Sequence, residues 1–539
     1  MRVSVFIVIF FSVIAGFSLL KPGLPPTHDG EYHVIRFYEF DKALRDGNPY
    51  PRWAPDLNNG FGAPLFNYVY PFPNYVASFL HLFGFSFIDA FKLNLFFATI
   101  FSAIFFYLWT RMLWGDLGGV VSSIFYTFSP YRFLDIYIRG SVGEIWAMAF
   151  LPAFLWSITI FFKDKNLKYF ILSSLFLTLI ILSHNILGLM FFVFIGFYII
   201  FLIYQSKEKK YFILNTLYLI LLGLGLSSIF WLPALFENKF VTGLQIYRVS
   251  ENFPDLYQLL IPSWGSGFSG QNFFGGMSFQ IGIANLLGAI LGFLSLIILL
   301  KRKDKRVGLI FFFFAAFIFV FFLMLKISLP VWKIIPMMSY FQFPWRFLSL
   351  EILIVSFLAG SIFVLWKNYI LAGFLILLAV LLSINYAKPA YYHQRDDNYY
   401  ISRSNFIDGT NSPGNYFNTI WFNKNLTKRK NKLESDNNFS ILSMVTKSHE
   451  EKFQLKTDNE GLVILNTAYF PGWTLFINGN RKEISKTEDG RISFILPKGV
   501  SIVEILFLNT FIRNLAVFIT IISIFIFMIL FKKSFEDKK

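Results

Sequence analysis

A polar segment with several titratable side chains follows the first apolar stretch of the sequence. It holds, in one short run, His28, Asp29, Glu31, His33 and Arg36. A helix that begins near Asp29 would place Asp29, His33 and Arg36 on one face, because positions i, i+4 and i+7 share a face of an α-helix. Two titratable groups and a cation on one face could form a catalytic site with a carboxylate as general base. A solvated, charged helix is the alternative interpretation.

The composition indicates a helical protein that crosses a membrane many times. The mean hydropathy is +0.56, and only 15% of the residues are charged. The chain contains no cysteine, which excludes disulfides and thiol-ligated metals. Much of the net charge of +16 falls in short clusters beside apolar segments. This pattern indicates that the charges set the orientation of the spans in the membrane and contact anionic lipid. It gives no support to nucleic-acid binding.

Twelve apolar stretches are candidates for membrane spans, and we expect about twelve transmembrane helices. They are roughly 3–20, 88–110, 116–134, 144–162, 168–184, 186–204, 211–234, 279–300, 307–327, 344–366, 368–387 and 511–531.

Threading these spans from a cytoplasmic N-terminus places every tight Lys/Arg cluster that flanks a span on the cytoplasmic side. This works only if the apolar stretch 66–85 does not cross the membrane, and its Pro71 and Pro73 favour a juxtamembrane or re-entrant helix. We therefore expect a multi-pass protein of the cytoplasmic membrane with both termini in the cytoplasm. Residues 1–20 are interpreted as a retained signal anchor, a cleaved signal peptide being the alternative.

The chain divides into three parts. Residues 1–387 form a transmembrane domain with a long first extracytoplasmic loop at 21–87, and residues 511–539 form a final anchor and cytoplasmic tail. Between them, the polar block 388–510 ends in short β-type runs separated by turn signals. One of these signals, Asn478-Gly479, is typical of a tight hairpin. We expect this block to be a small extracytoplasmic domain resembling a β-sandwich.

The threading gathers further ionisable groups near the outer ends of the spans, namely Arg139, Glu144, His184, Arg346 and Glu351. Each has a structural alternative: Arg139 could simply pair with Glu144, and Glu351 with Arg346. Together they suit a site for a lipid phosphate, in which a carboxylate acts as base and an arginine neutralises the leaving phosphate.

Two further predictions concern the neighbourhood of this site. A divalent metal could bind to His28, Asp29 and Glu144, although such groupings also occur by chance. The loop 235–278 carries Arg248 and Trp264 and could close over an acceptor, with a flexible linker as the alternative.

The strings HDGEYH at 28–33, RGSVGE at 139–144, WLPALFE at 231–237 and QFPWRF at 342–347 resemble a known family over nearly the whole chain. It is the family of 6-pyruvoyl-tetrahydropterin synthase-related membrane proteins, and the C-terminal part is also similar to YfhO-type proteins. The name does not describe a function here, because a pterin synthase is a small soluble enzyme with a zinc-binding histidine triad. This chain has only six scattered histidines in a membrane scaffold.

The architecture of the resembled family implies the GT-C superfamily of glycosyltransferases, which use polyprenyl-phosphate-linked sugars. By that resemblance Asp29 takes the position of the acidic catalytic residue that follows the first span, and Glu144 takes that of a second acidic residue. A clear D-x-D motif is missing from the first loop, which leaves metal dependence open.

The leading hypothesis is therefore a GT-C-like glycosyltransferase that transfers a sugar from a polyprenyl-phosphate donor to a glycan, lipid or protein acceptor. Asp29 would be the general base, assisted by His33 and Glu144. The substrates would be bound by Arg346, Arg139, His184, Arg248 and Trp264. A transporter or lipid flippase is the main rival, and a non-catalytic protein of cell-surface polymer assembly is a second one. The sequence shows no internal repeat of the kind common in transporters.

Overall fold

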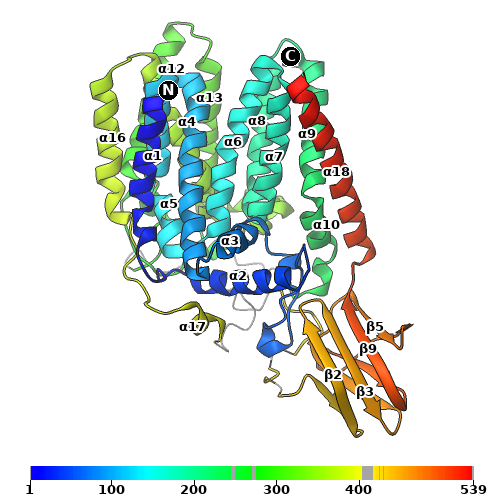
Figure 1. Ribbon diagram of the computed structural model, residues 1–539. Helices are drawn as coiled ribbons and strands as arrows, with labels where there is room; N and C mark the ends of the chain where they lie inside the picture. The colour runs from blue at the N-terminus through cyan, green and yellow to red at the C-terminus, as the bar shows by residue number, and fades with distance from the viewer. Residues whose placement is uncertain are drawn as a thin grey trace.

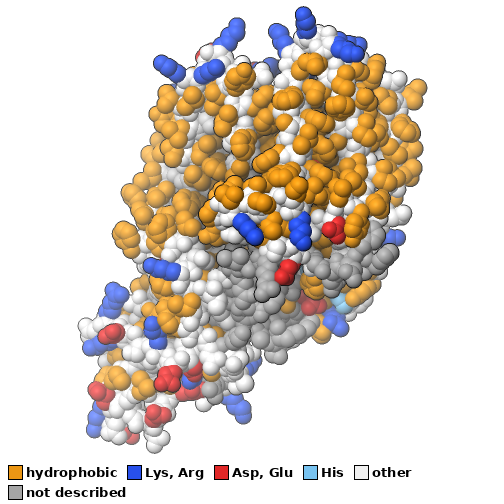
Figure 2. Space-filling model, turned by 180° about the vertical axis from the view of Figure 1, so that it is seen from behind, with side chains coloured by type: hydrophobic (Ala, Val, Ile, Leu, Met, Phe, Trp, Pro, Cys, Tyr) orange, Lys and Arg blue, Asp and Glu red, His pale blue; other side chains and the backbone are white. Residues whose placement is uncertain are grey.

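The computed structural model describes residues 2–243, 249–269, 275–402, 417–423, 425–428 and 430–536. It consists of a helical bundle with a small β-domain at one end, and both chain termini lie at the opposite end (Figure 1). Apolar side chains cover the sides of the bundle, whereas Lys and Arg side chains stand out at the end that bears the termini (Figure 2). This distribution is that of a membrane protein, because an apolar surface of this extent must face lipid.

Ten helical segments in the described part of the chain are long and apolar enough to cross a membrane. They contain α1 (Arg2–Gly16), α4 (Phe87–Thr127), α6 (Val142–Asp164), α8 (Asn185–Gln205), α9 (Lys209–Leu226), α12 (Ile283–Lys301), α13 (Val307–Met324), α15 (Leu348–Ala359), α16 (Tyr369–Ser383) and α18 (Phe511–Glu536). The apolar helix α7 (Leu167–Ser183) is slightly shorter, at 17 residues.

Helix α4 is in fact two antiparallel helices. At Gly115 the backbone takes φ 78°, which breaks the helix. Beyond this point the chain returns along itself, since the Ser123 hydroxyl donates a hydrogen bond to the carbonyl of Ala103 at 2.7 Å. The rings of Phe106 and Tyr126 stack with their centroids 4.4 Å apart. With α4 divided and α7 included, each of the predicted spans has a helical counterpart.

The predicted span 211–234 is not one continuous helix. It is interrupted at Ser227, which separates α9 from α10 (Ser228–Phe236). The physical reason is local: the Ser227 hydroxyl bonds back to the carbonyl of Gly223 at 2.9 Å, and such a bond competes with the helical pattern.

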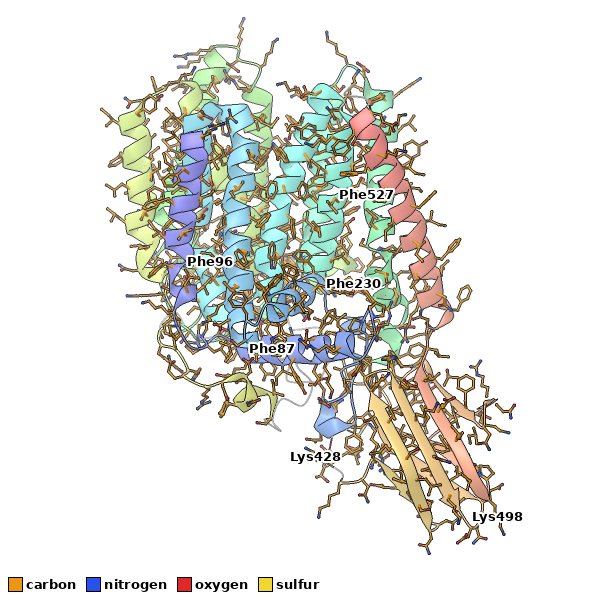
Figure 3. The ribbon with its side chains drawn as sticks, viewed as in Figure 1. Phe87, Phe96, Phe230, Lys428, Lys498 and Phe527 are labelled. Atoms are coloured by element: carbon orange, nitrogen blue, oxygen red, sulfur yellow. The ribbon has the colours of Figure 1, made fainter. Side chains whose placement is uncertain are left out.

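Two short helices lie across the end of the bundle that faces the β-domain (Figure 1). They are α2 (Gly30–Arg45) and α3 (Phe72–Leu82), joined by the rest of the first loop. Helix α3 has 11 residues and is too short to cross a bilayer, in agreement with the prediction for 66–85. Phe87, at the start of α4, lies close to α2 (Figure 3).

The predicted small β-domain before the last helix is confirmed, and it consists of two antiparallel sheets. One has the order β1-β4-β8-β7 and the other β2-β3-β9-β5-β6. The strands are β1 (Leu433–Ser435), β2 (Phe439–Lys447), β3 (Glu450–Thr457), β4 (Gly461–Ala468), β5 (Trp473–Ile477), β6 (Asn480–Lys482), β7 (Ser485–Lys486), β8 (Arg491–Leu496) and β9 (Gly499–Phe507). Phe453 of one sheet and Phe494 of the other belong to one buried core, as in a sandwich.

The tight hairpin predicted at Asn478-Gly479 joins β5 to β6. Both residues have positive φ, 51° for Asn478 and 79° for Gly479. Two consecutive positive φ angles are those of a type I′ turn, in which Asn-Gly is the favoured pair.

A buried polar network joins the β-domain, the bundle and the first loop. Arg513, at the start of α18, pairs with Glu237 at 3.0 Å and donates to the carbonyl of Pro471 at 2.9 Å. Glu237 also accepts from the amide of Asn67 at 2.9 Å, and Asn67 in turn accepts from Arg52 at 2.9 Å. Because these polar groups are buried, each depends on its partners in the other segments. The first loop is therefore held in place, together with α2 at its beginning.

Candidate functional site

The segment that precedes α2 is bound to the turn that follows α5 (Pro130–Leu134). The backbone N–H groups of His28 and Asp29 donate to the carbonyls of Ile138 and Arg139 at 2.8 and 2.9 Å. Gly140 makes this close contact possible: its φ is +67°, and a Cβ there would lie 2.3 Å from the hydroxyl oxygen of Thr27. Asp29 thus stands directly beside the RGSVGE turn, at the point where α2 begins.

Three of the predicted site residues lie around the carboxylate of a fourth, Glu144. The two terminal nitrogens of Arg139 bind its two oxygens at 2.6 Å each. Arg346 Nε lies 3.2 Å and His184 Nε2 3.8 Å from Oε1. Asp135 adds a second carboxylate that pairs with Arg139. All five side chains are buried, so their charges are weakly screened and strongly coupled.

Each member of this ionic cluster is fixed by its own local structure. Arg346 lies in a short 3₁₀ turn, Pro344–Phe347, and its Nη1 also donates to the carbonyl of Phe341 at 3.2 Å. His184 caps α8, because its Nδ1 accepts from the N–H of Leu187 at 3.1 Å. A neutral ring that accepts at Nδ1 carries its proton on Nε2, and this nitrogen faces Glu144. The pairing of Arg139 with Glu144 considered from the sequence is present in the structure.

Glu351 is not part of the cluster. Its side chain is buried in α15, and its carboxyl oxygens have no hydrogen-bond partner within the described residues. The alternative that Glu351 pairs with Arg346 is wrong, because Arg346 binds Glu144.

His33 lies on α2 behind Asp29 and is almost completely buried. Its ring packs on those of Phe37 and Phe91, with centroids 5.8 and 5.9 Å away. Burial lowers the pKa of His33 well below 6.5, and the charge of Arg36 lowers it further. The imidazole is therefore neutral at physiological pH, and it supports α2 from within.

The burial of His33 predicts a pH-dependent stability. Above pH 6.5 the imidazole is neutral in both the folded and the unfolded state. As the pH falls below 6.5, the unfolded chain binds a proton that the folded state rejects, so stability falls by up to about 1.4 kcal/mol per pH unit. We expect His33→Phe to remove this component, measured as the thermal midpoint between pH 8 and pH 5. An unchanged pH dependence in the variant would contradict the expectation.

Tyr70 is a site residue that sequence reasoning missed. Its ring packs on that of His184, with centroids 5.0 Å apart, and a Cβ at Gly143 would lie 2.4 Å from it. Burial raises the pKa of Tyr70 to about 12; to a smaller extent the charge of Arg36 lowers this pKa and the charges of Asp29 and Glu144 raise it. Tyr70 therefore lies between the ionic cluster and the segment 27–29, called here the Asp29 segment. The available signal was its place in the string NYVYPFP, just before the two prolines.

The described part of the loop 235–278 lies against the Asp29 segment. The ring nitrogen Nε2 of His28 is 2.8 Å from the carbonyl of Ser266, and the His28 ring stacks on Phe268 with centroids 4.6 Å apart. Trp264 stacks on Tyr386 at 4.5 Å, so one face of its indole is already covered. Arg248 lies outside the described residues.

The residues predicted to bind a metal do not form a metal-binding group. Within the described ranges, no three or more His, Asp or Glu side chains are placed to hold an ion. The carboxylate of Glu144 is bound by two guanidinium groups, a set of partners that competes with a cation. His28, Asp29 and Glu144 thus do not fit a divalent ion in this arrangement.

Comparisons with known proteins identify related sequences and similar structures. A family model described as "6-pyruvoyl-tetrahydropterin synthase related domain; membrane protein" matches residues 66–389. An uncharacterised protein of Lactococcus lactis subsp. cremoris is 22% identical over 254 residues, which are 46% of this chain and 41% of that protein.

Two solved structures are similar at low sequence identity. Arabinofuranosyltransferase AftD from Mycobacteria is 14% identical with a TM-score of 0.46, covering 72% of this chain and 27% of that one. Archaeal oligosaccharyltransferase AglB from Archaeoglobus fulgidus is 12% identical with a TM-score of 0.48, covering 78% and 61%. The chain thus spans less than two thirds of the length of each of these proteins.

Proposed function

The chain belongs to the 6-pyruvoyl-tetrahydropterin synthase related family of membrane proteins, and from this starting point we propose that it is a membrane glycosyltransferase. It would transfer a sugar from a polyprenyl-phosphate donor to a glycan, lipid or protein acceptor. The observation that carries the proposal is the attachment of the Asp29 segment to the ionic cluster of Arg139, Glu144, His184 and Arg346. The half-buried Asp29 thus lies at the start of α2 beside the backbone of Arg139, whose guanidinium shares the carboxylate of Glu144 with that of Arg346.

In the proposed reaction, Asp29 accepts the proton of an acceptor hydroxyl as that oxygen bonds to the anomeric carbon of the sugar. The bond between this carbon and the phosphate oxygen breaks, and the leaving lipid phosphate takes the electron pair. Arg346 and Arg139 stabilise the negative charge that develops on the phosphate. Guanidinium groups suit this role, because they bind phosphate oxygens through paired N–H donors.

The other residues predicted for the site orient or support the reacting groups. Glu144 holds both arginines, so its carboxylate orients the cations, and His184 is fixed beside it. His33 stays neutral and supports the start of α2. The loop with Ser266 and Phe268, which contacts His28, would cover the acceptor side, and the contribution of Arg248 and Trp264 to binding stays a prediction.

The direct test is a transfer assay with the full-length protein in liposomes. Polyprenyl-phosphate-linked sugars with a radioactive sugar would be supplied with an envelope extract as acceptor. We expect label in the acceptor and release of free polyprenyl phosphate. Movement of the labelled lipid between leaflets without any transfer would contradict the proposal and favour a flippase.

The proposed site requires the β-domain to lie outside the cytoplasm, with both termini inside. The abundance of Lys and Arg at the end with the termini supports this orientation. Asn438 is exposed on the β-domain, and the chain contains no cysteine, so Asn438→Cys introduces a single thiol. We expect this thiol to react with a membrane-impermeant maleimide in intact cells. Labelling only after lysis would overturn the orientation, and a single cysteine at Lys305 is the matched control for the opposite side.

A further inference from the structure

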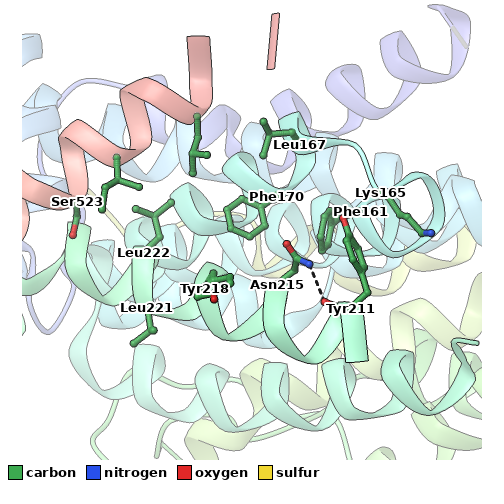
Figure 4. A pocket seen from close by; sticks show the side chains of 12 residues that line it. Phe161, Lys165, Leu167, Phe170, Tyr211, Asn215, Tyr218, Leu221, Leu222 and Ser523 are labelled. Atoms are coloured by element: carbon green, nitrogen blue, oxygen red, sulfur yellow. Dashed lines mark hydrogen bonds between the residues drawn. The ribbon is translucent and has the colours of Figure 1, made fainter. Parts of the chain in front are cut away.

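A cavity of about 460 Å³ opens between four helices, and no residue of the ionic cluster lines it (Figure 4). Its wall is formed by the end of α6, the start of α7, one face of α9 and the second half of α18. The lining is largely apolar and aromatic, with Phe170, Tyr218, Leu222 and Ile526 among its members, and Lys165 is its one charged residue. The volume falls in the range of ligand-binding pockets.

The first half of α18 packs closely on α9 and α10 through small side chains. There Thr520 lies 2.9 Å from the hydroxyl of Ser228, and a Cβ on Gly225 would lie 2.1 Å from that of Ser523. Beyond Ser523 the lining passes to Ile526 and Leu530, which face the cavity. The cavity between α18 and its neighbours thus begins at Ser523, the last of these small residues on α18.

The length of the cavity corresponds to one leaflet of a bilayer. On α9 its lining extends from Tyr211 to Leu222, which is about 16 Å at 1.5 Å per residue. The hydrocarbon core of a bilayer is about 30 Å thick, so one leaflet contributes about half of that. An acyl chain that enters from the end with the termini would extend along the cavity towards Ser523.

Positive charge surrounds the mouth of the cavity. Lys165 is the C-cap of α6, and its neighbours Lys163 and Lys168 are exposed. The adjoining loop and the end of α18 add the exposed residues Lys207, Lys209, Lys210, Lys532 and Lys533. Glu208 pairs with Lys165 at 2.5 Å, and Glu208 and Asp164 together offset only part of the charge of these eight lysines. Basic clusters at the edge of the hydrocarbon region attract anionic headgroups.

We propose that this cavity is a binding site for a phospholipid with an anionic headgroup, held with an acyl chain along α9 and α18 and its phosphate among the lysines near Lys165. The occupant would fill the gap beside α18, the helix that carries the β-domain, and so stabilise its attachment. The proposal is independent of the sugar-transfer reaction, because the site shares no residue with the ionic cluster.

The test uses the full-length protein in detergent, with dioleoyl phosphatidylglycerol as the anionic lipid and dioleoyl phosphatidylcholine as the zwitterionic one. Native mass spectrometry would report bound lipid, and thermal melting would report stabilisation. We expect phosphatidylglycerol to bind at least about tenfold more tightly than phosphatidylcholine, a difference of about 1.4 kcal/mol. Equal binding of the two lipids would overturn the proposal.

Two pairs of variants locate the site. Asn215→Trp projects into the cavity and should abolish the tight binding, whereas Leu214→Trp, one position away on the exposed surface of α9, should leave it unchanged. Lys165→Asn removes the one charged residue of the lining and should reduce the preference for phosphatidylglycerol. Its control is Lys303→Asn at the end of α12, because both lysines have nearly the same positive φ, 51° and 53°. An undiminished preference in Lys165→Asn, or retained binding in a folded Asn215→Trp, would refute the assignment.

Discussion

Asp29→Asn is expected to abolish sugar transfer while leaving the folded protein in the membrane. A general base contributes about 10²- to 10⁴-fold to a rate, and an amide cannot accept the proton. The substitution spares the structure, because Asp29 is held through its backbone: its N–H donates to Arg139, its carbonyl accepts from His33, and its side chain makes no capping bond to α2. The measurement is the rate of label transfer in liposomes, together with the surface glycans of cells that carry only the variant.

Glu31→Gln is the matched control, since it removes a carboxylate two residues away on another side of the same helix. We expect it to retain activity. Normal glycans in the Asp29→Asn strain would eliminate Asp29 as the base, and an equal loss in both variants would indicate that α2 tolerates no change of charge.

Glu144→Leu is expected to destabilise the protein strongly. The substitution leaves the guanidiniums of Arg139 and Arg346 buried with too little negative charge, and removing one partner of a buried ion pair costs about 3–5 kcal/mol. Glu144→Gln keeps the shape and part of the hydrogen bonding, so its effect should be smaller. Thermal melting of the purified protein in detergent measures both effects.

The comparison is with Glu504→Leu in the β-domain, where the carboxylate pairs with Lys452 at the surface. Exposed pairs contribute about 0–1 kcal/mol, so this variant should melt close to the wild type. If Glu144→Leu were no less stable than Glu504→Leu, the cluster would be solvated. This result would contradict the proposed role of Glu144 in orienting the arginines.

The features that the sequence predicted well are those set by neighbouring residues. Long apolar runs must form helices in a membrane, because no water is present to satisfy the backbone, and so the spans could be recognised individually. The helix considered from near Asp29 is present as Gly30–Arg45, and the turn at Asn478-Gly479 followed from its residue types.

The strands β2 and β3 were missed, because the composition between 433 and 460 is charged and polar. Strand β2 is exposed along nearly its whole length and so lacks the alternation of a half-buried strand. Strand β3 does alternate, with Phe453 and Leu455 buried between polar or charged neighbours, and this signal was present. Short alternating runs among charges are easily taken for loops.

The site could be predicted only in part, because its residues meet through packing. Arg139 and Glu144 are near in sequence, but Tyr70 and His184 are separated by 114 residues and come into contact only when the first loop folds over the bundle. Asp135 was missed because it looks like one more residue of a span end, although it pairs with Arg139. Threading placed these groups at one depth, and depth does not specify which side chains touch.

The polar network that links Arg513, Glu237, Asn67 and Arg52 makes the sandwich and the first loop a single mechanical unit. Trp53 and Phe61 of that loop even belong to the apolar core of the β-domain. A tilt of the β-domain must therefore displace the loop segments before and after α2. A force applied to the β-domain is transmitted to the first loop, and the reverse.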